Sequence, residues 1–146
     1  MNRIVRTSAL LMTLFVTAQG QSTGVLGNWT NPTGSTIHIY TCGSKICAKL
    51  VAIRKDTPTR VDAKDPNPAL RGRSLCGLQI GEDFEPRGAD RAQGGRLYDP
   101  ESGKTYTGSM TRQGDKLKLR GYVGLPIFGR TETWSHAPGT IAPCRP

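Results

Sequence analysis

The stretch that decides the fold is residues 104–123, KTYTGSMTRQGDKLKLRGYV. Its second half alternates between apolar or small residues and mostly charged ones, as a strand with one buried face does. The two sets are Leu117, Leu119, Gly121 and Val123 on one face and Lys118, Arg120 and Tyr122 on the other. Gln113-Gly114-Asp115 is a turn signal, so the stretch predicts an antiparallel hairpin of residues 104–112 and 116–123.

Similar short runs of strand-forming residues occur on both sides of this hairpin. They cover residues 27–29, 36–40, 46–53, 76–80, 95–98 and 126–134. Turn residues separate them, and no segment has the period of an amphipathic helix. About eight short strands predict an all-β fold, and a small antiparallel eight-stranded barrel would leave no exposed strand edge.

Length and composition fit this fold. The chain has 146 residues, a formal charge of +9, 18 Gly and 10 Pro. That is the size of one domain, and the apolar content of 36% excludes a disordered chain. The basic residues are spread along the chain and form no basic stripe with interleaved aromatic residues, so we expect no nucleic-acid partner.

The first 18 residues have the anatomy of a secretory signal peptide. Arg3 and Arg6 precede an apolar run, 8–16, and small residues at 16–18 predict cleavage after Ala18. The run is too short to span a bilayer, so no transmembrane segment is expected in the mature chain, which is the single barrel domain 19–146. Cleavage leaves 18 basic and 11 acidic residues, and a periplasmic or secreted location is expected.

Four cysteines remain after cleavage: Cys42, Cys47, Cys76 and Cys144. An even number in an exported chain predicts two disulfides, and three pairings are possible. Cys42 and Cys47 flank a hairpin loop, which makes a local bridge easy and would leave Cys76 for Cys144. A zinc site is the weaker reading, because no second close pair supports it.

The polar segment 54–74 is too long for a simple turn. It carries Pro58, Pro66, Pro68 and several charges. Loops of this size in compact domains are often functional, so the segment is a second candidate working surface.

Several sequence blocks, taken in order, resemble the bacterial exported family called domain of unknown function 2147. The blocks are Gly27-x-Trp29, Asp65 to Leu78, Gly94 to Tyr106, Leu117 to Tyr122 and Phe128 to Trp134. The Gly-x-Trp start also resembles calycin and lipocalin barrels. This resemblance implies a small exported calycin/lipocalin-like barrel, and it supplies no catalytic residue because the family carries no established activity.

Two residues are expected to close one end of that barrel. In the lipocalin-like arrangement, the guanidinium of Arg130 would stack on the indole of Trp29, next to Gly27. We therefore interpret these three residues as structural.

The candidate ligand-binding residues are aromatic and basic. They are Tyr98, Arg120, Tyr122, Arg130 and Trp134. Neighbouring strands would place the last four on one face. If that face is internal, the buried arginines need an anionic ligand or carboxylate partners; if it is external, they form a solvated basic surface.

Three functions are compatible with the sequence. The leading hypothesis is an exported barrel that binds a small or anionic ligand in its cavity or at its mouth. The alternative is a solidly packed envelope module that contacts other proteins or has a structural role. An enzyme ranks third, because no serine, histidine or aspartate occurs in a catalytic motif. No catalytic residue, cofactor or metal is expected.

Overall fold

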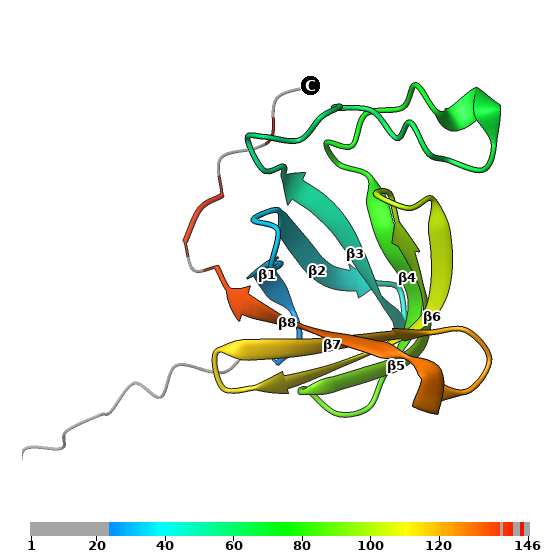
Figure 1. Ribbon diagram of the computed structural model, residues 1–146. Coiled ribbons are helices and arrows are strands. Elements are labelled where there is room, and N and C mark those ends of the chain that lie inside the picture. The colour runs from blue at the N-terminus through cyan, green and yellow to red at the C-terminus, as the bar shows by residue number, and fades with distance from the viewer. Residues whose placement is uncertain (1–23, 138, 142–143, 145–146) are drawn as a thin grey trace, which may run out of the picture.

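The computed structural model describes residues 24–137, 139–141 and 144. The predicted signal peptide, residues 1–18, lies outside them. In the described part of the chain, each strand pairs antiparallel with the next one. Strand β8 pairs with β1 and closes the barrel (Figure 1). The strands are β1 Gly27–Thr30, β2 Thr36–Cys42, β3 Lys45–Ala52, β4 Gln79–Pro86, β5 Arg91–Asp99, β6 Lys104–Gln113, β7 Lys116–Tyr122 and β8 Arg130–His136. The predicted eight-stranded antiparallel barrel is confirmed.

Two predicted boundaries are wrong. The last strand begins at Arg130 instead of residue 126, because Pro126 has no N–H for the ladder and starts the short 3-10 turn η2, Pro126–Phe128. The second concerns the charged segment 81–91, which lies between the predicted strands 76–80 and 95–98. It completes β4 and its hairpin to β5, with Phe84 buried and Glu85 exposed, so one face is apolar although the segment is polar overall.

One continuous hydrophobic cluster occupies the barrel interior. Its largest members are Trp29, Phe84, Met110, Leu117 and Trp134, all buried. Glycines make room for the ring of Phe84: a Cβ on Gly95 would lie 2.3 Å from the Phe84 ring, and one on Gly108 would lie 2.8 Å from it. The interior is thus packed by side chains from facing strands.

The two ends of the barrel differ. The short hairpins β2–β3, β4–β5 and β6–β7 lie at one end, together with the segment that leads into β1. The opposite end carries the longer connections, including residues 53–78 between β3 and β4 (Figure 1). We call these the hairpin end and the loop end.

Residues 53–78 form an ordered cover at the loop end. Leu75 and Leu78 are buried in the core cluster, and Pro68–Leu70 forms the 3-10 turn η1. Asp62 is 0% exposed and accepts hydrogen bonds from Arg73 Nε and Nη2 at 3.0 and 2.8 Å. Arg73 also bonds Asp65 at 2.7 Å. Because the buried carboxylates are paired, these polar groups stabilise the cover.

Two disulfides join the cysteines as Cys42–Cys47 and Cys76–Cys144. The first closes the β2–β3 hairpin, and the second ties the chain after β8 to Cys76 in the cover. Cys144 N also donates to Val51 O of β3. Disulfides are typical of proteins outside the reducing cytoplasm. Within the described residues, no helix has the length and apolar character needed to cross a membrane.

Candidate functional site

The segment before β1 crosses the hairpin end and is fixed there by two hydrogen bonds. Val25 N donates to Ala89 O at 2.9 Å, and Val25 O accepts from Trp29 Nε1 at 2.9 Å. Gly24 is needed at its position, because a Cβ there would lie 2.0 Å from Ala89 O. The backbone of the segment is therefore held in place above the core.

The cation that closes this end is Arg112, near the end of β6. Its guanidinium carbon lies 5.8 Å from the centroid of the Trp29 ring. Arg112 Nη1 donates to Gly24 O at 3.1 Å, and Nε donates to Gly114 O at 2.7 Å. One side chain thus joins the Trp29 ring, the segment before β1 and the β6–β7 turn.

The expectation that Arg130 stacks on Trp29 is not what the structure shows. Arg130 is exposed at the start of β8, opposite Gly121, whereas Trp29 pairs with His136 at the other end of that strand. Six residues of extended strand separate the two positions, too far for a side chain to span. Gly27 does begin β1, with φ of 113°.

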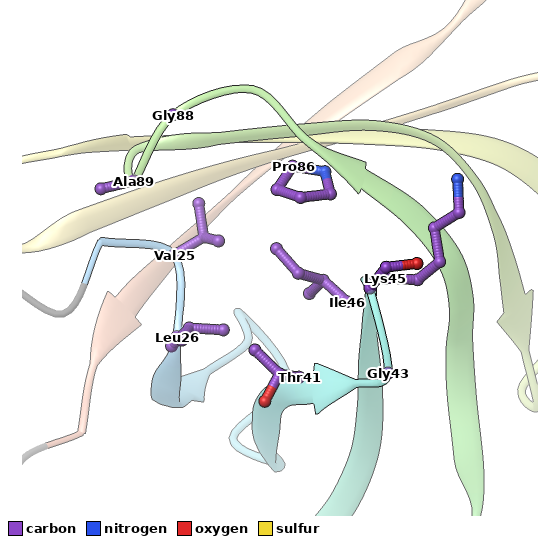
Figure 2. Close-up of a pocket in the computed structure, with 10 residues that line it drawn as sticks. Val25, Leu26, Thr41, Gly43, Lys45, Ile46, Pro86, Gly88 and Ala89 are labelled. Carbon is purple, nitrogen blue, oxygen red and sulfur yellow. The ribbon is translucent and has the colours of Figure 1, made fainter.

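A hollow of about 270 Å³ opens beside the segment before β1. We call it the end hollow. Figure 2 shows the side chains of Val25, Leu26, Ile46 and Pro86 directed toward it, with Thr41 at its rim. Its full lining is Val25, Leu26, Thr41, Gly43, Ser44, Lys45, Ile46, Pro86, Gly88 and Ala89.

Three parts of the chain set the walls of the end hollow. They are the segment before β1, the β2–β3 hairpin and the β4–β5 hairpin. The Cys42–Cys47 disulfide braces the second wall. Lys45 Nζ bonds Glu85 Oε1 at 3.2 Å and so joins the second wall to the third.

The chemistry of the end hollow favours a small apolar group. Carbon atoms of Val25, Leu26, Ile46 and Pro86 dominate the lining, and Thr41 brings a hydroxyl group to it. Ligand sites commonly combine such an apolar lining with a few polar groups that fix orientation.

The predicted ligand-binding residues do not come together. Arg120 pairs with Thr131 and Arg130 with Gly121, so the two arginines project from opposite faces of the β7–β8 pair. Tyr122 shares the outer face of Arg120 by strand alternation, whereas Trp134 lies opposite buried Leu117. The assumption of one shared face was wrong, because the register between strands fixes the faces.

Three of these five side chains have local partners. Arg120 donates to Pro126 O and Thr131 Oγ1, and Trp134 Nε1 donates to Glu132 Oε2 at 2.9 Å. Tyr98 Oη donates to Asp62 Oδ1 at 2.6 Å. Partial burial and this hydrogen bond raise the pKa of the Tyr98 hydroxyl. We therefore assign Tyr98 a structural role, in which its hydroxyl holds the cover at the loop end to β5.

A second hollow, of about 510 Å³, lies on the outer wall of β1–β3. Asn28, His38 and Lys49 line it, together with parts of residues 139–144. His38 Nδ1 lies 2.8 Å from Asn28 Oδ1, and burial and the nearby Lys49 charge lower the pKa of His38. Among the described residues, no cluster of His, Cys, Asp and Glu is arranged to hold a metal ion.

No motif in the sequence predicts the end hollow. Its lining comes from three separated segments that share no motif. Only the turn residues between Cys42 and Cys47 marked one of its walls.

The chain matches a known protein family and is similar in fold to a solved structure. Residues 27–136 match the family described as "Uncharacterized protein conserved in bacteria (DUF2147)". The solved structure of protein HP1028 from the human pathogen Helicobacter pylori, described as belonging to the lipocalin family, is similar, with a TM-score of 0.73 and 22% identity. The match covers 80% of this chain and 85% of that one, and shows a shared fold. No curated protein matches the chain.

Proposed function

The chain belongs to the DUF2147 family of bacterial proteins, and on that premise we propose that it is an exported lipocalin-like barrel that binds a small apolar ligand in the end hollow. Eight-stranded barrels are either filled by side chains or hold one small ligand. In this chain the core cluster takes up the interior, which leaves the barrel mouth at the hairpin end for a ligand.

One observation supports this proposal above the others: an apolar hollow whose three walls are each fixed by a specific bond. The bonds are Val25 to Ala89, Cys42 to Cys47, and Lys45 to Glu85. A preformed site costs little ordering on binding, so even a small ligand gains affinity. An anionic ligand held by Arg120 and Arg130 is not supported, because they lie on opposite faces.

Export is part of the proposal. It is supported by the charge and apolar pattern of residues 1–18 and by the two disulfides. The intact mass of the protein from the cell envelope tests it. We expect a chain that begins at Gln19 with both disulfides formed.

The second candidate is a packed envelope module that acts without a ligand. The filled interior favours it, because this is the feature that distinguishes a structural or interaction barrel from a hollow carrier. The two candidates differ in whether the end hollow binds a small apolar molecule.

A titration with 1-octanol, followed by backbone amide NMR shifts, separates them. Ligand binding predicts saturable shifts at Val25, Ile46 and Ala89. Thr41→Trp, placed at the rim of the end hollow, should abolish them, whereas Thr133→Trp, on exposed β8, should not. Shifts that are absent from the wild type, or unchanged in Thr41→Trp, would favour the packed module.

A further inference from the structure

Apolar side chains gather at one exposed connection, between β7 and β8. Val123, Leu125, Ile127 and Phe128 are 71, 63, 77 and 78% exposed. The other large apolar side chain that stands out to solvent in the described residues is Leu70, at 40%. Single exposed apolar residues are normal, but a cluster marks an interaction surface. We call residues 123–128 the apolar tip.

The apolar tip is an ordered structure. Phe128 N donates to Leu125 O and Gly129 N donates to Pro126 O, each at 3.1 Å. Arg120 Nε donates to Pro126 O at 3.0 Å, and Arg120 Nη1 donates to Thr131 Oγ1 at 2.9 Å. The guanidinium of Arg120 therefore ties both sides of the connection together and holds its side chains outward.

The charge around the apolar tip is uniformly positive along the chain. Residues 116–131 contain Lys116, Lys118, Arg120 and Arg130 and no acidic residue. Lys118 and Arg120 share the outer face of β7, whereas Lys116 begins this strand at the hairpin end and pairs with Asp115. A cluster of cations beside exposed apolar side chains matches the two layers of an anionic membrane surface, charged headgroups above acyl chains.

We propose that the apolar tip docks the barrel on an anionic phospholipid surface. Ile127 and Phe128 enter the boundary between headgroups and acyl chains, and the cations nearest the tip, Lys118, Arg120 and Arg130, contact lipid phosphates. The connection projects beyond the ends of β7 and β8 (Figure 1), and a narrow projection with apolar side chains is suited to insertion between lipid headgroups. The tip is at the loop end, so this docking is independent of the end hollow.

Cosedimentation with vesicles tests this proposal on the exported chain with both disulfides formed. We expect binding to vesicles of phosphatidylethanolamine and phosphatidylglycerol, weaker binding at high salt, and little binding to phosphatidylcholine alone. Ile127→Ser/Phe128→Ser should weaken the partition by about tenfold or more, because two large side chains lose their apolar burial.

The matched control is Leu70→Ser, which removes an exposed apolar side chain from another part of the loop end. It should bind like the wild type, and equal melting temperatures show that the variants fold. In Phe128→Trp, a blue shift of the tryptophan emission on anionic vesicles reports insertion. No binding by the wild type overturns the proposal. Unchanged binding by Ile127→Ser/Phe128→Ser also overturns it, because the protein would then adsorb through its charges without using the apolar tip.

Discussion

The guanidinium of Arg112 lies over the ring of Trp29, 5.8 Å from its centroid, and at the same time bonds the carbonyl of Gly24. Strand β6 thereby holds the segment that forms one wall of the end hollow. Closure of the barrel and formation of the candidate site depend on the same side chain.

Arg112→Ala should therefore lower the free energy of unfolding by about 1–3 kcal/mol, since it removes a cation–π contact and two hydrogen bonds. Arg130→Ala should change it by less than about 0.5 kcal/mol, because Arg130 is exposed. Chemical denaturation of both variants checks this. Equal losses would mean that Arg112 does not close the barrel.

The hydrogen bond between half-buried Tyr98 and buried Asp62 predicts a loss of stability at alkaline pH. The folded protein raises the pKa of Tyr98 through burial and its bond to Asp62, so the unfolded chain releases this proton first. The contribution is fully present below about pH 10, the ordinary tyrosine pKa, and declines as the pH rises beyond it. Tyr98→Phe should remove this decline.

Denaturation of the wild type and of Tyr98→Phe at pH 8 to 11 measures the difference. At pH 8 the variant should be less stable by about 1–2 kcal/mol, because a bond to a buried carboxylate is lost. The gap should narrow above about pH 10. A constant gap would contradict the assigned role of Tyr98.

Packing around Phe84 predicts that Gly95→Ala is costly. The added Cβ would lie 2.3 Å from the Phe84 ring, which is buried on all sides and has nowhere to move. Overpacking of this kind costs about 1–3 kcal/mol. Gly72→Ala, where nothing lies within 4 Å of the new atom, is the control and should be near neutral in the same unfolding assay.

The two disulfides should contribute unequally. In the chain-entropy model, a bridge that spans 5 residues contributes about 2 kcal/mol and one that spans 68 about 4 kcal/mol. Cys76→Ser/Cys144→Ser should therefore destabilise more than Cys42→Ser/Cys47→Ser in denaturant melts. The reverse order would show that the hairpin bridge supports more of the fold than its loop length implies.

The barrel could be predicted from sequence because strand alternation is local. Residues 104–123 show this alternation clearly. Ile80 and Phe84 show it only weakly, because charged residues lie between and after them, and the predicted strand therefore ends at Ile80. The last strand is predicted too long at its start, because Phe128 continues the alternation of Arg130, Glu132 and Trp134 in the sequence. In the structure Phe128 belongs to the turn η2 and is exposed.

The candidate site could not be predicted, for a different reason. Which cation reaches Trp29 depends on strand register around the whole barrel, and this puts Arg112 and not Arg130 at the hairpin end. The lining of the end hollow meets only after closure, from residues as far apart as Val25 and Ala89. No local pattern carries that information.

Native mass spectrometry of the protein, purified gently from the envelope of a bacterium that produces it, tests ligand binding most directly. We expect a chain with both disulfides and an added small mass that is lost on denaturation, present in the wild type and in Thr133→Trp and absent from Thr41→Trp. A bare mass for the wild type, or the same added mass in Thr41→Trp, would contradict a ligand in the end hollow.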